Sequence, residues 1–113
     1  MSEHTNQAAV RVISLEGRVR MGESVDRFRA AIEDSLQNGH ARIIVDLTRV
    51  TMLDSSGIGV LVRSMTLAKQ KGGAIKICGV AANVAHSLKI TGVVRLFEIY
   101  PDEAAARAAF SPS

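Results

Sequence analysis

The residues with the clearest chemical potential are those of the run Asp54-Ser55-Ser56-Gly57, which follows a strongly apolar segment. An aspartate just before a helix can accept hydrogen bonds from backbone N–H groups of the first turn, because these groups have no partner within the helix. The two serines then fall in that first turn, where the helix dipole favours negative charge. A hydroxyl placed there is suited to carry a phosphate group.

Gly57 and Gly59 remove side chains from the same turn. Residues this small predict exposed backbone that another molecule can approach closely. A purely structural interpretation stands beside this one: Asp54 and the serines cap a helix, and the glycines let that helix pack tightly on a sheet. Spacing alone favours the structural interpretation, because serines that cap helices are far commoner than serines that carry a function.

The elements that must position this turn are predicted from hydrophobic periodicity and from glycine punctuation. Ser24 is expected to cap a helix whose apolar residues recur every three or four positions, and Asn38-Gly39 is expected to end it. Residues 48–53 are expected to connect a strand to the Asp-Ser-Ser-Gly turn. Strands are predicted at 9–15, 43–47, 74–78 and 94–99, and helices at 25–37, 55–71, 83–89 and 102–110.

This alternation predicts one α/β domain over residues 1–113, with a mostly parallel (mixed) sheet of four to five strands and about four helices. Residues 1–8 are expected to form a tail or an edge strand, and residues 111–113 a tail. The polar start lacks the apolar region of a signal peptide, and no apolar run approaches the ~20 residues of a membrane span. We therefore expect a cytoplasmic protein.

Composition argues against several function classes. The 14 Lys and Arg residues are spread along the chain, without the concentrated basic face that nucleic-acid binding needs. Cys78 is the single cysteine, so neither an intrachain disulfide nor a cysteine metal cluster is expected, and the three histidines lack metal-ligand spacing. No nucleophile elbow and no glycine-rich phosphate loop are present, so we expect no enzymatic activity, no cofactor and no metal.

Five apolar side chains are interpreted individually. Three methionines are expected to pack in the core, with a place lining the loop near Ser55 as an alternative for Met52. Two residues of the helix that begins after Asp54 are expected either to cover a neighbouring loop or to be exposed for a partner. The methionines are Met21, Met52 and Met65, and the two open positions are Val60 and Leu67.

Over nearly its whole length the sequence resembles the STAS domain (sulfate transporter and anti-sigma-factor antagonist), specifically the stand-alone bacterial antagonists. The most specific part is the signature Asp54-Ser55-Ser56-Gly57-Ile58-Gly59, which follows the strand Ile44-Val45-Asp46-Leu47. The other parts are Gly17 after the first strand, Gly72-Gly73 before the third strand and Ile90-Thr91-Gly92 before the last one.

The resemblance implies that Ser55 is phosphorylated by an anti-sigma factor that is also a serine kinase of the histidine-kinase-like ATPase fold. The unphosphorylated chain is implied to bind this kinase and free its sigma factor, and a separate phosphatase is implied to remove the phosphate. Asp54 would orient the turn, and Ser56 would be a neighbouring contact or a second acceptor. No nucleic acid and no membrane insertion is implied, and a homodimer is possible but not indicated. The residues expected to contact the partner are Asp54, Ser55, Ser56, Gly57, Ile58, Gly59, Arg18 and Arg20.

The sequence departs from the family pattern just after Gly17. Many antagonists carry an acidic residue there that contributes to partner contact, whereas this chain has Arg18-Val19-Arg20-Met21. The departure concerns the partner and not the fold. Two other functions stay open beside the antagonist: an accessory subunit of a membrane transport or signalling scaffold complex, and a domain that senses a small ligand.

Overall fold

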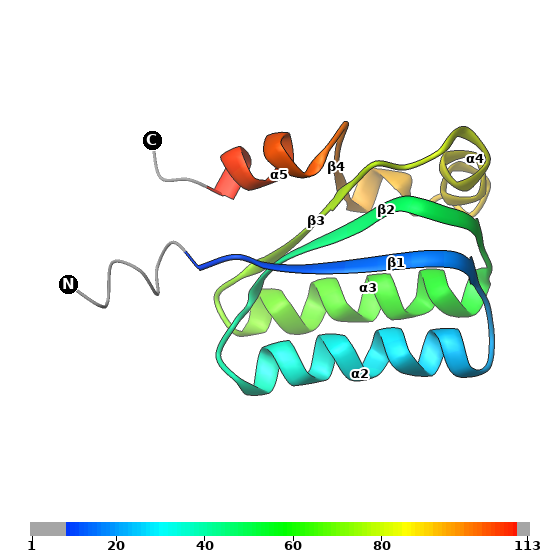
Figure 1. Cartoon of the computed structure of the whole chain (residues 1–113). Helices are drawn as coiled ribbons and strands as arrows, with labels where there is room; N and C mark the ends of the chain where they lie inside the picture. The colour runs from blue at the N-terminus through cyan, green and yellow to red at the C-terminus, as the bar shows by residue number, and fades with distance from the viewer. Residues whose placement is uncertain (1–8, 111–113) are drawn as a thin grey trace.

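The computed structural model describes residues 9–110, in which strands and helices alternate (Figure 1). The tail or edge strand expected at residues 1–8 and the tail expected at 111–113 lie outside these residues. In chain order the elements are β1 (Arg11–Val19), α2 (Glu23–Gln37), β2 (Arg42–Leu53), α3 (Ser55–Gln70), β3 (Ala74–Cys78), α4 (Ala82–Ile90), the 3-10 turn η1 (Val94–Leu96), β4 (Glu98–Tyr100) and α5 (Glu103–Phe110).

The four strands form one sheet in the order β1-β2-β3-β4, and every pairing among them is parallel. Helices α2 and α3 lie side by side along one face of the sheet, and α5 lies against the opposite face (Figure 1). The carboxyl ends of β1 and β2 lie together at one end of the sheet, where α3 begins. Both ends of the described chain lie at the opposite end of the sheet. The predicted α/β fold with its parallel sheet is confirmed.

The main core lies between the sheet and the helices α2, α3 and α4. β2 is buried on both faces over its first half, as expected for a central strand flanked by helices. The apolar residues of α2 that recur at helical spacing form the predicted stripe: Ala31 is half-buried, and the fully buried members are Val25, Phe28, Ile32 and Leu36.

A smaller cluster on the opposite face attaches α5. Ile44 and Cys78 pack there against Ala106. Lys76 of β3 is also buried on this side, where its ammonium group pairs with Glu98 and lies 4.8 Å from the ring centroid of Phe110. A buried charge is tolerated when it has an ionic partner, and the aromatic ring face adds a further attraction.

Two strands are longer than the sequence predicted. β1 continues to Val19, with register shifts on either side of Gly17, whose φ is +71°. β2 continues through residues 48–53, which were predicted as a connection, and ends at Leu53. The added halves pair with each other, so their extended conformation depends on a partner strand that a local pattern does not reveal. As a result, β2 runs directly into Asp54.

Two further predictions of local structure were wrong. Residues 94–96 form η1, and the strand β4 is limited to residues 98–100, where a strand over 94–99 was predicted. Ser24 does not cap α2, because the helix already begins at Glu23 and Gly22, with φ +119°, occupies the capping position without a side-chain bond. A backbone angle of this kind strongly favours glycine, so the start of α2 is set by Gly22.

Candidate functional site

Asp54 is the N-cap of α3, as the sequence predicted. Its backbone is extended, with φ −90° and ψ −179°, and its Oδ1 accepts hydrogen bonds from the backbone N–H of Gly57 at 3.0 Å and the hydroxyl of Ser56 at 2.7 Å. The first turn of α3 is therefore organised by one carboxylate oxygen. Because α3 starts where β2 ends, this turn lies at the carboxyl edge of the parallel sheet, where binding sites of α/β proteins commonly occur.

The second oxygen of Asp54 reaches a different segment. Oδ2 accepts from the backbone N–H of Met21 at 2.9 Å, and the Asp54 N–H donates to the carbonyl of Val19 at 3.0 Å. Asp54 thus connects the first turn of α3 to residues 20–22, which we call the β1–α2 loop. Sequence reasoning missed this connection, because the two segments are more than thirty residues apart and no local signal joins them.

The electrostatics of Asp54 follow from these bonds. The hydrogen bond from the Ser56 hydroxyl, together with those from the backbone N–H groups of Gly57 and Met21, outweighs the effect of partial burial and lowers the pKa of Asp54. Hydrogen bonds to the ionised form stabilise it, so Asp54 is a carboxylate at neutral pH. The turn therefore already holds one negative charge before any modification.

The two serines of the turn have different surroundings. Ser55 is the first residue of α3 and is exposed, and its hydroxyl makes no hydrogen bond to any residue from 9 to 110. Ser56 is half-buried, and its hydroxyl is committed to Asp54. Of the two hydroxyls, that of Ser55 is the one accessible to an external reagent.

The glycines of the signature also differ from each other. Gly57 is buried, and a Cβ atom at its position would lie 2.6 Å from Cδ1 of Leu53 and 3.1 Å from Cγ1 of Val19. The prediction of exposed backbone was therefore wrong for Gly57, which packs closely against the ends of both strands. Gly59 is exposed, with nothing within 4 Å of such a Cβ, so the prediction holds there.

A groove extends along α3 from Ser55. It has a volume of about 770 Å³, and both apolar and polar side chains of α3 line it. Ile58 lines the groove, although most of its side chain is buried in the core. Of the two positions that the sequence left open, Val60 is buried, and Leu67 is half-buried and lines the groove. The full lining consists of Ser55, Ile58, Gly59, Val62, Arg63, Thr66, Leu67, Gln70, Thr91 and Val93.

Of the two basic residues expected to contact a partner, Arg18 lies near the end of β1 and Arg20 in the β1–α2 loop, and both are exposed. The structure gives their side chains no ion pair within residues 9–110. Met21 follows them with 80% of its surface exposed, and Met52 near the end of β2 is 37% exposed. The prediction that these two methionines pack in the core was wrong, whereas Met65 is half-buried and packs against the core as predicted.

Other residues weighed from the sequence lie apart from this turn. Cys78 is buried in the small cluster beneath α5, and burial raises its pKa to about 11, so it is a thiol at neutral pH. Within residues 9–110, no three His, Cys, Asp or Glu side chains gather where they could hold a metal ion. Over the same residues, no helix combines the length and apolar character that crossing a bilayer demands.

Comparison with known proteins assigns the chain to a family. The STAS domain family matches residues 3–106. An anti-sigma F factor antagonist of Paenibacillus polymyxa is 29% identical over 102 residues, which cover 89% of this chain and 86% of the relative. An anti-sigma-factor antagonist (STAS) domain protein from Planctomyces limnophilus has the same fold, with a TM-score of 0.79, 24% identity and 93% of each chain covered.

Proteins with different roles have this fold. The Bacillus cell fate determinant SpoIIAA in its phosphorylated form matches with a TM-score of 0.71 and 21% identity over 90% of this chain and 91% of that one. The STAS domain of a SulP transporter from Vibrio cholerae also has this fold, with a TM-score of 0.68. Since the family match spans nearly the whole chain and includes the turn built on Asp54, this protein belongs to the STAS domain family.

Proposed function

We propose that this protein is an anti-sigma-factor antagonist whose binding to its partner is controlled by a phosphate on Ser55. The observation that carries the proposal is the contrast between the serines: the hydroxyl of Ser55 is exposed and unengaged, whereas that of Ser56 is held by Asp54. Membership of the STAS family and the relative named an anti-sigma F factor antagonist support it. The chain itself is proposed to have no enzymatic activity and to act in the cytoplasm.

The proposed partner is an anti-sigma factor that is also a serine kinase of the histidine-kinase-like ATPase fold. In the phosphorylation step, the Ser55 oxygen forms a bond to the γ-phosphorus of ATP, and the bond from that phosphorus to the β–γ bridging oxygen breaks. ADP leaves, and the hydroxyl proton passes to a base of the kinase. A phosphatase reverses the modification with water as the nucleophile, giving inorganic phosphate and free Ser55.

Release of the partner follows from charge. A phosphoserine carries about −1.5 to −2 charges at pH 7. On Ser55 it is added to a turn that already holds the Asp54 carboxylate, at a position where the unphosphorylated hydroxyl carries no charge. The first-turn N–H groups of α3 tolerate the anion within the chain. A docked partner must instead desolvate it, and binding weakens.

Titration calorimetry with the purified anti-sigma factor tests this function. We expect wild type and Ser55→Ala to bind equally, Ser55→Asp to bind more weakly, and the phosphorylated protein to lose at least a hundredfold in affinity, which is about 2.7 kcal/mol. Aspartate carries less charge than phosphate, so its effect is expected to be the smaller one. Equal affinity of all four proteins would show that Ser55 only begins a helix.

The transport-complex alternative is kept because a transporter STAS domain has the same fold. Purification of the chain from its native cell, followed by mass spectrometry, separates the two. An ATP-binding kinase is expected with the antagonist, and a transporter ATPase with the accessory subunit. A small-ligand sensor would show a rise in melting temperature with its ligand and would require no protein partner.

A further inference from the structure

The β1–α2 loop presents an apolar side chain that the fold does not use. Met21 is 80% exposed, more than any other large hydrophobic residue between 9 and 110. Leaving such a side chain in water forfeits the stabilisation that burial gives. A single exposed hydrophobic residue needs no explanation by itself, so its setting must decide whether it has a role.

That setting is a loop held in place at the first turn of α3, residues 54–57, which we call the switch turn. The N–H of Met21 donates to Asp54, and Ser24 closes the loop by accepting from the N–H of Arg20 at 3.0 Å and donating to its carbonyl at 2.8 Å. The backbone that carries Met21 is therefore fixed to Asp54, the residue before Ser55, and to the start of α2. A fixed backbone loses little conformational entropy on binding, which is what an interface anchor requires.

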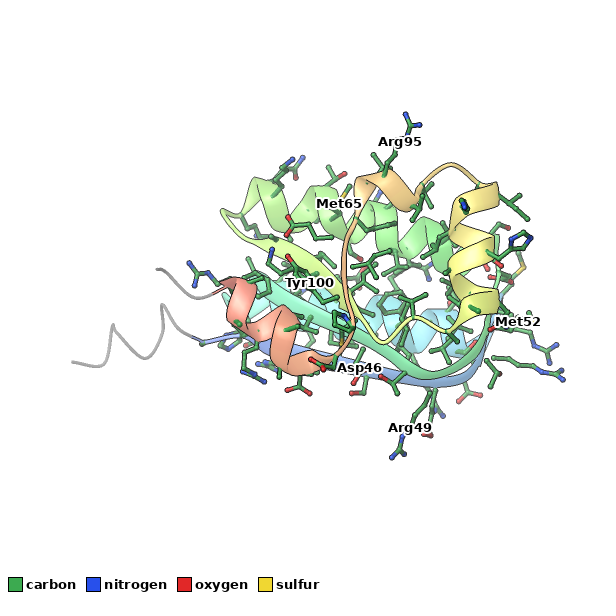
Figure 2. All side chains as sticks on the ribbon, turned by 90° about the horizontal axis from the view of Figure 1, so that it is seen from above. Asp46, Arg49, Met52, Met65, Arg95 and Tyr100 are labelled. Atoms are coloured by element: carbon green, nitrogen blue, oxygen red, sulfur yellow. The ribbon has the colours of Figure 1, made fainter. Side chains whose placement is uncertain are left out.

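A second apolar side chain lies at the same edge of the sheet. Met52 is two residues before Asp54, and in the β1–β2 pairing it is opposite Arg18. Figure 2 shows Met52 at the end of the sheet and away from Arg95, which projects from η1 on another side. Methionine adapts its shape to a partner surface, and methionine and arginine are enriched in protein interfaces.

The charge beside these methionines is positive. Arg18 and Arg20 are exposed and have no ion pair within the described residues. Of the acidic residues nearby, Glu23 pairs with Arg27 and Asp54 accepts hydrogen bonds from the turn and the loop, while Glu16 is exposed in β1. Arg20 therefore directly precedes the exposed Met21, and Arg18 lies opposite Met52, with neither guanidinium group in an ion pair within the described residues.

We propose that Met21 is the apolar anchor of the partner interface and that the docking face of the anti-sigma factor is an apolar pocket rimmed by carboxylates that pair with Arg18 and Arg20. This inference rests on the proposed function and defines the chemistry of the partner. It also specifies how the phosphate acts. A phosphate on Ser55 attracts the arginines within the chain and repels the carboxylates of the partner, so both effects favour release.

The test compares matched pairs of variants in titrations with the purified anti-sigma factor at low and high salt. Met21→Ala is paired with Leu96→Ala, and Arg20→Glu with Arg95→Glu, because Leu96 and Arg95 are exposed on η1, and Figure 2 shows Arg95 on another side of the molecule from Met52. We expect Met21→Ala and Arg20→Glu each to weaken binding at least tenfold and both controls to stay within twofold. Met21→Leu, which keeps the apolar volume, should retain wild-type affinity. The loss caused by Arg20→Glu should shrink at high salt.

The methyl groups of the methionines provide a direct readout. With methyl-labelled methionine, the signals of Met21 and Met52 should shift on addition of the partner, while that of Met65, packed against the core, stays in place. Wild-type affinity in both Met21→Ala and Arg20→Glu overturns the inference and leaves the proposed function standing. Failure of the wild-type chain to bind any anti-sigma factor contradicts the proposed function and this inference with it.

Discussion

Asp54 is the residue on which the candidate site depends. One of its oxygens holds the first turn of α3 through Gly57 and Ser56, and the other holds the loop of Met21. The two functions have different chemical requirements. A neutral amide can still accept through its carbonyl oxygen, but the NH2 group that replaces the second oxygen is a donor only.

Substitution of Asp54 should separate these two functions. Asp54→Ala removes both and is expected to lower the free energy of unfolding by about 1–2 kcal/mol, as loss of an N-cap does. Asp54→Asn keeps the bond from Gly57 and loses the one from Met21, so its stability should be intermediate. Urea unfolding gives the stabilities, and hydrogen exchange at the Met21 amide should be faster in both variants. Unchanged exchange in Asp54→Asn would show that the loop does not depend on the carboxylate.

The same carboxylate gives a pH dependence of known sign. The folded protein holds the Asp54 proton less tightly than the unfolded chain, whose pKa is near 3.8, because the hydrogen bonds lower the folded pKa. The stabilisation by the ionised form is complete above the unfolded pKa and is lost as the pH falls through the lowered folded value. The difference in unfolding free energy between wild type and Asp54→Asn should be constant at neutral pH and shrink below about pH 4. A difference that grows in acid would contradict this assignment.

The two serines predict where phosphate is found. After incubation with the kinase and ATP, peptide mapping should place the phosphate on Ser55, and Ser56→Ala should still be phosphorylated. The reason is that the Ser56 hydroxyl is half-buried and donates to Asp54, while that of Ser55 is exposed. Phosphate on Ser56 alone would reverse the assignment.

At the scale of elements, α3 is positioned by the contact of its first turn with the ends of β1 and β2. Gly57 makes this contact possible, because any side chain there meets Leu53 and Val19, whereas Gly59 faces open space. The pair of glycines therefore provides an internal comparison. Both lie in the same helix, so the intrinsic helix preference for alanine, about 1 kcal/mol, acts on both.

Gly57→Ala and Gly59→Ala should accordingly differ in stability. Gly59→Ala gains helix preference without a clash, so its unfolding free energy should rise by up to about 1 kcal/mol. Gly57→Ala must displace buried Leu53 and Val19, and overpacking of this kind costs about 1–3 kcal/mol. Thermal or urea unfolding of both variants measures the gap. Equal stability would mean that the strand ends adjust freely to the added methyl group.

The elements also show how far the sequence could predict the structure. The buried stripe of α2 and the cap at Asp54 follow from local periodicity and capping chemistry, and both were predicted correctly. The outer halves of β1 and β2 were missed because each becomes extended by pairing with the other. Met21 was placed in the core because its residue type suggests burial, whereas its exposure is set by Gly22 and by the long-range bond to Asp54.

At the scale of the whole molecule, the fold should be the same with and without phosphate on Ser55. The residue lies on the surface at one edge of the sheet, and a helix N-terminus accommodates an anion. Backbone NMR spectra of the two forms should differ only around the first turn of α3 and the β1–α2 loop. Shift changes spread through β3 and α5 would show that the switch is conformational instead.

The arrangement of the two chain ends has a practical consequence. The start of β1 and the end of α5 lie at one end of the sheet, and Ser55, at the start of α3, lies at the opposite end (Figure 1). A fluorescent protein or a surface linker joined to either side of the described chain would project away from the switch turn. The domain is therefore suited to immobilisation or to construction of a binding sensor in which the label does not obstruct the partner.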